Sequence, residues 1–451
     1  MSTIIPSKFS RRSFLRTSSL ASGGMLIGFN LFTACKDNVR MPVDIAELDY
    51  NDFNAFIKIS NEGMVTIFSP NPEIGQGVKT SMPMIIAEEL DVPWENVNVV
   101  QVALDTKNYT RQVAGGSQSI RFGWDALRET GASARQILIN AAAARWGVDP
   151  SECSAKQGVI TNANGNTLSY GEVVNEAAKL EYERASSYED IAEGELAEEE
   201  KEAIILKDPK DFTIIGTDRG NVDIDDIITG KPLFGLDYKV DGMLYASVLR
   251  PPAFGQVLES YDGTDAKAIP GVVDVIKIGE KAKNLLDGEE INWTVKLAPT
   301  EKVVVIAENS WAAIKGKKAL KATWSDSTPL ESTEVHDKVL NDLLNGKDFK
   351  TLRKDGDINK AFTTADRVLE RTYESPFLPH NTMEPMNFFA DVTDEKIHLV
   401  GPIQTPEAVA ATVAEMLGRD LADVHLEMTR MGGGFGRRLY GDFVYEAAEI
   451  S

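Results

Sequence analysis

Short apolar runs separated by turn residues open the patterned part of the sequence. The runs at 55–59 and 64–68 flank the turn sequence Asn-Glu-Gly at 61–63, which is typical of a β-hairpin. A further apolar run at 97–102 predicts another strand. We therefore expect a small sheet at the start of the fold, after an exposed polar linker at 36–52.

Two helices are expected beside these strands. The first has its apolar residues at helical spacing: Met82, Ile85, Ile86 and Leu90. On this helix we expect Glu88 and Glu89 to face water. The second covers about 120–146, where an alanine run at 141–144 favours helix and Gly147 provides a stop signal.

Strand patterns dominate the middle of the chain, from 212 to about 326. They occur as three apolar runs, at 243–249, 271–276 and 303–307. One helix interrupts them after Asn309, and the apolar face expected for it consists of Trp311, Ile314 and Ala319. An acidic run at 187–202 precedes this region and indicates a solvated helix or linker.

The last region contains two more predicted strands, at 368–373 and near 397–400. A glycine-rich loop and the start of a helix follow them. The expected apolar face of that helix consists of Phe443, Ala447 and Ile450. Helices and strands in this mixture predict an α+β fold.

The N-terminus carries an export signature. Arg11 and Arg12 precede a charge-free, weakly apolar stretch from Thr17 to Cys35, which is typical of a twin-arginine signal, with a short membrane anchor as the alternative. The residues before Cys35 resemble a lipoprotein cleavage box, with ordinary signal cleavage as the alternative. Twin-arginine export carries folded proteins, often with a cofactor inserted. We therefore expect the protein in the periplasm or anchored to a membrane after export.

The composition excludes several functional classes. The chain has 451 residues, 69 of them acidic and 47 basic, and the net charge of −22 opposes binding to nucleic acid. Two cysteines are too few for a disulfide scaffold, a four-cysteine zinc site or a cysteine-ligated iron–sulfur cluster within this chain. Cys153 is most simply a small buried hydrophobe.

Three glycine-containing loops share one character. They are Gly75-Gln76-Gly77, Gly115-Gly116-Ser117-Gln118-Ser119 and Gly432-Gly433-Gly434-Phe435-Gly436. Each offers backbone N–H groups, and the three together suit a large anionic cofactor with phosphate and a heterocycle. Taken singly, each loop is more typical of a tight turn. No Gly-Lys-Ser/Thr sequence follows, and the spacing of a dinucleotide fingerprint is absent from the third loop.

The four histidines suggest no metal centre. They lie at 336, 380, 398 and 425, and no pair has helical metal-ligand spacing. His380 and Glu384 allow a zinc site, but a hydrogen-bonded structural pair is the simpler interpretation. No arrangement typical of a serine hydrolase is visible.

Several motifs together resemble the molybdopterin-binding large subunits of the xanthine dehydrogenase/aldehyde oxidase family, and most closely the isoquinoline 1-oxidoreductase β subunits. They are spread over nearly the whole sequence: Pro72–Thr80, Ala87–Leu90, Leu206–Phe212, Gly230–Gly235, Met243–Ala246, Arg250–Pro252, His380–Asn387 and Gly433–Gly436. In the wider family the Gly-Gln-Gly segment follows the Gly-Phe-Gly loop. Here it precedes that loop, as in the isoquinoline-type subgroup.

The resemblance implies a domain organisation. An a/b hammerhead domain would cover 212–326, flanked by molybdopterin-binding segments at 36–185 and 327–451, with an acidic linker at 186–211 and the export signal at 1–35. It also implies the reaction, which is hydroxylation of a carbon next to a ring nitrogen, or of an aldehyde, with oxygen from water.

The resemblance assigns site residues one by one. Gln404 would be the catalytic glutamine near the molybdenum, and Gly433, Gly434, Phe435 and Gly436 would form a backbone cradle beside it, followed by Arg437. Gly75, Gln76 and Gly77 would contact the pterin. Gly116, Ser117 and Gln118 would bind its phosphate or nucleotide extension. Backbone donors of this kind orient a cofactor without entering the ligand field of its metal.

The same resemblance implies cofactors and partners. The cofactor would be molybdopterin with molybdenum, in the cytosine dinucleotide form. Because the chain has no cysteines for a cluster, a separate small ferredoxin-like [2Fe–2S] subunit would receive the electrons, and a cytochrome c is a plausible acceptor for an exported enzyme. The substrate would be a small molecule.

One departure concerns the catalytic base. The family uses a glutamate in a Gly-Glu-Pro-type motif near the C-terminus, and none occurs near the end of this sequence, because Met383-Glu384-Pro385 matches a different motif. The last helix also lacks a capping signal. We therefore expect a truncated or split product that is inactive alone and needs its C-terminal part.

Three hypotheses follow. The first is a molybdenum hydroxylase large subunit, the second a non-catalytic exported remnant, and the third an exported binding lipoprotein without a cofactor.

Overall fold

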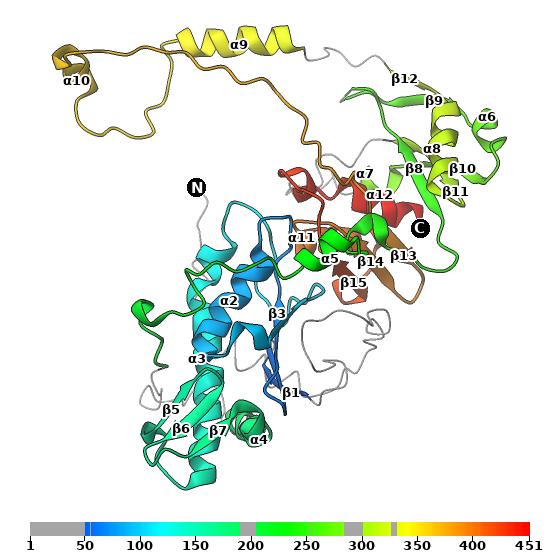
Figure 1. The fold of residues 1–451 in the computed structure, drawn as a ribbon. Coiled ribbons are helices and arrows are strands. Elements are labelled where there is room, and N and C mark those ends of the chain that lie inside the picture. Colours follow the sequence, from blue (N-terminus) through cyan, green and yellow to red (C-terminus); the bar gives the residue numbers. More distant parts are fainter. Residues whose placement is uncertain (1–49, 55, 190–203, 254, 284–300, 326–331) are drawn as a thin grey trace. The chain divides into compact units, whose positions relative to one another are not determined.

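The computed structural model describes residues 50–54, 56–189, 204–253, 255–283, 301–325 and 332–451. It contains helices and strands in two compact units, which confirms the α+β prediction (Figure 1). One unit comprises 1–241, 281–299 and 382–451, and the other 242–280 and 300–381. The export signal, Cys35 and most of the acidic run lie outside the described residues.

The first unit begins with a four-stranded sheet. Its strands are β1 (Tyr50–Asn54), β2 (Ile57–Ser60), β3 (Val65–Ser69) and β4 (Val97–Gln101), in that spatial order. The first three are antiparallel, and β4 runs parallel to β3 after a crossover through α2 (Val78–Leu90). The three predicted strands are confirmed, and β1 occupies the end of the stretch expected to be a linker.

The core of this unit lies between the sheet and its helices. Helix α3 (Ser119–Trp146) packs along α2, as Figure 1 shows, and the predicted helix and its stop at Gly147 are confirmed. The two helices approach so closely that a Cβ on Gly131 would lie 2.3 Å from the carbonyl oxygen of Ile86. The helices therefore need glycine at this crossing.

The prediction that Glu88 and Glu89 face water is wrong, because both side chains are fully buried. Glu88 pairs with Lys207 Nζ at 2.6 Å and accepts backbone N–H bonds from Ile214 and Ile215. Glu89 accepts from Arg128 Nε at 2.7 Å and from the backbone N–H of Lys207. A segment more than a hundred residues away in sequence covers this end of α2, and helical spacing alone does not predict that.

A small antiparallel sheet and a helix complete the first half of this unit. The sheet consists of β5 (Cys153–Lys156), β6 (Val159–Asn162) and β7 (Thr167–Ser169). Helix α4 (Tyr170–Glu189) follows, and Tyr170 donates to the carbonyl oxygen of Leu90 at 2.7 Å. Cys153 is partly buried against the same core and carries a free thiol.

The C-terminal part of the same unit repeats an order of elements seen at its start. The strands β13 (Phe389–Val392) and β14 (Ile397–Gly401) form an antiparallel pair, α11 (Pro406–Leu417) crosses over, and β15 (Val424–Met428) runs parallel to β14. A glycine loop and α12 (Asp442–Ile450) follow. The predicted strand near 397–400 and the final helix are confirmed.

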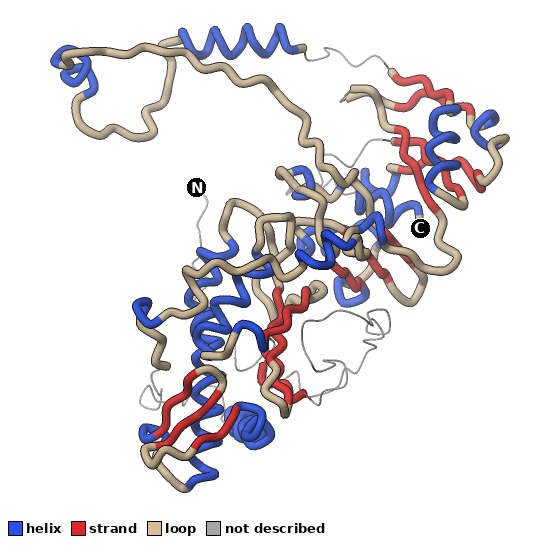
Figure 2. The backbone as a smooth tube through the Cα atoms, viewed as in Figure 1, coloured by secondary structure: helices blue, strands red, loops and turns tan. Residues whose placement is uncertain are grey.

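Between these halves, the first unit contains the short helix α5 (Ile224–Thr229) and, at its boundary with the second unit, α7 (Glu280–Lys283). The second unit has a three-stranded antiparallel sheet in the order β10 (Val272–Ile278), β11 (Lys302–Ala307) and β8 (Tyr245–Leu249). Figure 2 shows its strands and helices. Its remaining elements are β9 (Leu258–Asp262), paired with β12 (Lys321–Trp324), and the helices α6 (Thr264–Lys267) and α8 (Ser310–Ala319).

The predicted helix after Asn309 is confirmed as α8. Of its predicted apolar face, Ala319 packs half-buried against the core of this unit, but the two large residues do not. Trp311 and Ile314 are exposed, and the buried residues are Ala312, Ala313 and Gly316. A Cβ on Gly316 would lie 2.6 Å from Val305 Cγ1. The helix therefore contacts the sheet through its small residues, which leaves the large side chains outside.

The stretch from 332 to 381 contains α9 (Thr333–Asn345) and α10 (Ile358–Thr364) and is exposed almost throughout. The strand predicted at 368–373 is wrong, because these residues pair with no strand among the described residues. No helix in the described part of the chain is long and apolar enough to cross a membrane.

Candidate functional site

The three glycine-containing loops meet in the first unit. The backbone N–H of Ala114 donates to the carbonyl oxygen of Gln404 at 3.0 Å, and Gln404 Nε2 donates back to the carbonyl oxygen of Ala114 at 2.7 Å. The N–H of Met431 donates to the carbonyl oxygen of Glu73 at 3.0 Å. These bonds join the loop after β3, the loop before α3 and the loop after β15, together with the crossover loop at 402–405.

The first loop is organised around a buried carboxylate. Glu73 is 2% exposed and accepts hydrogen bonds from the backbone N–H groups of Gly75, Gly77 and Lys79, at 2.8, 3.1 and 2.9 Å. The side chain therefore occupies the positive N-terminus of α2. The N–H groups of Gly75 and Gly77, which were predicted to contact the pterin, already have this internal acceptor.

Gln76 lies exposed at the tip of the same loop. Its Oε1 accepts from the N–H of Ile74 at 2.6 Å and its Nε2 donates to the carbonyl oxygen of Pro72 at 3.0 Å. Gly75 and Gly77 adopt φ values of +97° and +80°, a region in which most other residues are strained. The loop is therefore a rigid turn that presents Gln76 to the outside.

The second loop ends at the N-terminus of the 28-residue helix α3. Gly116 and Ser117 are exposed, and the Oε1 atom of Gln118 accepts a hydrogen bond from Arg111 Nη2. The guanidinium groups of Arg111 and Arg121 each lie 4.9 Å from the ring centre of Phe122. Two cations and the positive end of a helix dipole therefore lie close together here. Neither arginine was singled out by the sequence.

The third loop places its aromatic residue outside and one glycine inside. Phe435 is 67% exposed and has a φ of +51°, between Gly433 and Gly436, which also have positive φ. Gly434 is buried, and a Cβ on it would lie 2.7 Å from Gln404 Oε1 and 3.6 Å from Ile74 Cδ1. The predicted cradle residues therefore form one loop packed against Gln404.

Gln404 is the residue in which these contacts meet. Its side chain is 3% exposed, and its Oε1 atom has no hydrogen-bond partner among the described residues. A buried amide oxygen without a partner costs free energy, about 1–3 kcal/mol. Such an atom in a native fold needs an explanation, and a bound donor group supplies one.

Arg437 has a structural role in the described contacts. Its two terminal nitrogens donate to both carboxylate oxygens of Asp442 at 2.7 Å each, and its guanidinium lies 5.8 Å from the ring centre of Phe443. Burial opposes the charge on Arg437, but the bond to Asp442 outweighs it and raises the pKa of the guanidinium. This pair fixes the start of α12 relative to the third loop.

Arg438 is another residue that sequence reasoning missed. It is fully buried, and it donates to the carbonyl oxygens of Gly433 and Glu384 at 2.9 and 2.7 Å and to the carboxylate of Glu384 at 3.1 Å. The carboxylate of Glu384 also accepts from the N–H of Gly432 at 2.8 Å and from Asn387 Nδ2 at 2.9 Å. These partners replace the predicted pair of Glu384 with His380, which is exposed.

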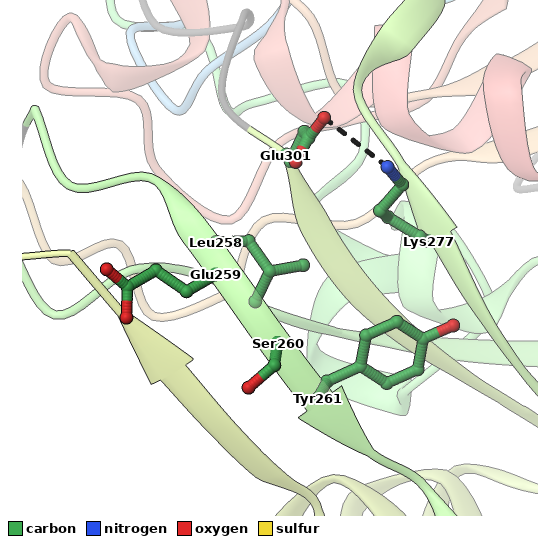
Figure 3. Close-up of a pocket in the computed structure, with 6 residues that line it drawn as sticks. All are labelled: Leu258, Glu259, Ser260, Tyr261, Lys277 and Glu301. Atoms are coloured by element: carbon green, nitrogen blue, oxygen red, sulfur yellow. Dashed lines mark hydrogen bonds and ion pairs between the residues drawn. The ribbon is translucent and has the colours of Figure 1, made fainter.

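A shallow hollow lies in the second unit. It is lined by Leu258, Glu259, Ser260, Tyr261, Lys277 and Glu301, and Figure 3 shows Lys277 paired across it with Glu301 at 3.4 Å. Lys277 also pairs with Glu280 at 3.0 Å. The hollow contains none of the predicted site residues, and the lysine that lines it is already neutralised.

Comparison with protein-family models identifies two domains with the same description. A molybdopterin cofactor-binding domain matches residues 19–223, and a second model with that description matches residues 335–449. The first match contains the loops at 75–77 and 115–119, and the second contains Gln404 and the loop at 432–436.

Three curated relatives match most of the chain. A membrane-bound aldehyde dehydrogenase (pyrroloquinoline-quinone) of Gluconacetobacter polyoxogenes is 30% identical over 98% of this chain and 54% of its own length. The isoquinoline 1-oxidoreductase β subunit of Brevundimonas diminuta is 26% identical over 100% of this chain and 59% of its own. A nicotinate dehydrogenase subunit of Pseudomonas putida is 27% identical over 88% of this chain and 31% of its own.

The chain thus spans between about a third and three-fifths of the length of these relatives. Both family models bear the same cofactor description, and their two matches contain the loops that the structure brings together. The chain belongs to the xanthine dehydrogenase/aldehyde oxidase family of molybdenum-dependent oxidoreductases, among its molybdopterin-binding subunits.

Proposed function

We propose that this chain holds a molybdenum–pterin cofactor where its glycine loops meet, as the cofactor-binding subunit of an exported hydroxylase or dehydrogenase. The single observation that carries the proposal is the buried Oε1 atom of Gln404, which lacks a partner among the described residues and lies beside Gly434. The substrate is an N-heterocycle or an aldehyde, in agreement with the names of the relatives.

The residues at this junction fit such a group. There is no room for a Cβ on Gly434, so the backbone of the third loop lies directly against the side-chain oxygen of Gln404. Gln404 is held by Ala114, and the buried Arg438 fixes the loop by donating to the carbonyl oxygen of Gly433. The junction is therefore rigid before any ligand arrives, which lowers the ordering cost of binding.

The anionic end of the cofactor has its own place on the second loop. The first turn of α3 has N–H groups without partners inside the helix, as at every helix start, and Arg111 and Arg121 lie next to it. We assign the phosphate groups of a cytosine dinucleotide extension to this region, with Ser117 and Gln118 as further polar contacts.

The chemistry divides between the group and the chain. When bound, a molybdenum–pterin group would supply the two-electron oxidation of the substrate carbon, which gains an oxygen from water while two protons are released. Gln404 and the third loop would orient the group, and Phe435 is exposed at the tip of that loop. A separate ferredoxin-like [2Fe–2S] subunit and a cytochrome c would receive the electrons. Export by the twin-arginine route would place the protein in the periplasm or anchor it through Cys35.

Metal and cofactor analysis of the native exported complex tests the proposal. We expect about one molybdenum per chain by mass spectrometry, with cytidine monophosphate released on hydrolysis of the extracted cofactor. Gln404→Ala and Gly434→Ala should each lower the molybdenum content, and Gln136→Ala on α3, whose side chain bonds only within its own helix, should not. Native protein without molybdenum, or with pyrroloquinoline quinone in its place, would contradict the proposal.

A further inference from the structure

Two histidines far apart in sequence lie side by side on the sheet of the C-terminal part. The strands β14 and β15 run parallel, and their register places His398 opposite His425. Glu427 lies two residues beyond His425 and therefore points to the same face of the sheet. The other face is apolar and packs into the core through Leu399, Leu426 and Met428.

The three side chains converge on one oxygen atom. His398 Nε2 lies 2.9 Å and His425 Nε2 lies 3.2 Å from Glu427 Oε1, and the two imidazole ring centres are 5.3 Å apart. One ligand atom from each residue falls within 4.8 Å of the others. Among the described residues, no other group of three such side chains is this close.

These separations are close to those around a bound ion. A tetrahedral zinc with bonds of about 2.0–2.1 Å to nitrogen and oxygen holds its ligand atoms about 3.3 Å apart. The two nitrogen–oxygen separations lie within a few tenths of an ångström of this value, and the two histidine nitrogens lie within 4.8 Å of each other. His425 is 60% exposed and Glu427 31% exposed at the side chain, so an ion can reach the cluster from solvent.

The neighbouring charges favour a cation. The carboxylate of Glu427 provides the one acidic group of the cluster and lies against both imidazole rings. Asp391 lies opposite His398 in the pairing of β13 and β14 and forms an ion pair with Lys396 at 3.2 Å. The ring centre of Phe389, on the neighbouring strand β13, lies 5.9 Å from the ring centre of His398.

We propose that His398, His425 and Glu427 form a binding site for a borderline divalent cation of the zinc class. Two imidazole nitrogens and one carboxylate oxygen match zinc better than calcium or magnesium, which prefer shells made only of oxygen. Water completes the shell on the exposed side. The bound ion links two neighbouring strands, and none of its ligands belongs to the loops that meet at Gln404.

Calorimetric titration of the full, tag-free chain with Zn²⁺ tests the site. We expect one saturable equivalent with a micromolar dissociation constant, and at least tenfold weaker binding in His425→Gln and in Glu427→Gln. His425 is largely exposed, so its replacement removes no core packing. His336→Gln, which changes a histidine of the second unit, should bind as tightly as the unaltered chain.

A second readout uses Co²⁺, whose visible absorption reports the coordination geometry. The unaltered chain should show a saturable band at one equivalent, and the His398→Gln variant should not. Absence of saturable Zn²⁺ binding, or equal binding by the unaltered chain and the Glu427→Gln variant, would overturn the proposal. Neither result would affect the molybdenum content, so failure here is distinct from failure of the proposed cofactor site.

Discussion

Glu88 shows how a single buried carboxylate holds a distant segment. Burial alone would raise its pKa, but the hydrogen bonds from Lys207 and from the N–H groups of Ile214 and Ile215 outweigh burial and hold the pKa below its usual value. The ionised form therefore stabilises the fold above the carboxylate's ordinary pKa. That stabilisation is lost as the pH falls through the lowered pKa of the folded state.

We expect Glu88→Gln to lower the free energy of unfolding by about 3 kcal/mol near neutral pH, because it removes the fully buried carboxylate that pairs with Lys207 and leaves Lys207 only its longer contact with Asp91 at 3.2 Å. The loss should shrink on acidification below about pH 4.5, where the unaltered chain also begins to lose the interaction. Denaturant unfolding between pH 3.5 and 7 measures both effects. Glu129→Gln, on an exposed face of α3, should leave both unchanged, and an equal effect of the two variants would contradict this role.

Arg438 leads to a second prediction at this scale. Lysine cannot reach the acceptors that the guanidinium joins, so Arg438→Lys should cost about 3 kcal/mol of stability. Arg419→Lys changes a partly exposed ion pair with Asp423 and should cost less than about 1 kcal/mol. Thermal and denaturant unfolding compare the two variants directly. Equal losses of unfolding free energy would show that the burial of Arg438 does not contribute to stability.

At the scale of elements, the crossing of α2 and α3 depends on one missing side chain. Gly131→Ala would place a Cβ 2.3 Å from a backbone carbonyl oxygen, which cannot move without shifting α2. We expect a loss of about 2–3 kcal/mol, in the range of overpacked cores. Gly123→Ala on the same helix meets only flexible ends of Leu127 and Met82, and should be neutral or stabilising by up to about 1 kcal/mol.

Denaturant midpoints of the Gly131 and Gly123 variants test this difference. Gly131→Ala protein as stable as the unaltered chain would show that the helices separate at little cost.

Helices and strands with a clear hydrophobic period were predicted from the sequence, but the face that each buries often was not. The strands at β3, β4 and β11 and the long helix α3 each match a local apolar pattern. The orientation of α8 depends on Gly316, because the absence of a side chain there lets the helix approach the sheet. The spacing of large apolar residues does not predict this contact. The run at 368–373 has the composition of a strand, but a strand also needs a partner.

At the scale of the whole molecule, the second unit has an unusually exposed stretch. Between 333 and 378 many large apolar side chains face solvent, and they include Leu343, Phe349, Leu352 and Tyr373. Exposed segments with little packing are preferred sites of proteolysis. Within the described residues, we therefore expect the first protease cleavage between 346 and 381, as measured by mass spectrometry of early fragments. First cuts inside α3 would contradict this expectation.

The candidate site was partly accessible to sequence reasoning. The glycine loops and Gln404 belong to recognisable motifs, and the structure brings them together. Glu73 and Arg438, which hold these loops in shape, bond mainly to backbone atoms. Every residue type supplies backbone atoms, so the sequence does not reveal these contacts. The cluster of His398, His425 and Glu427 depends on strand register, which becomes visible only after the parallel pairing is known.

The repeated order of elements in the first unit has a consequence for how the site is built. In each half a hairpin is followed by a crossover helix, a parallel strand, a loop and a second helix, and the halves exchange hydrogen bonds through Ala114, Gln404, Glu73 and Met431. The corresponding loops differ in chemistry, because Glu73 accepts hydrogen bonds from the start of its own helix, whereas the Oε1 atom of Gln404 has no partner among the described residues. One half therefore supplies a closed frame, and the other supplies the available acceptor.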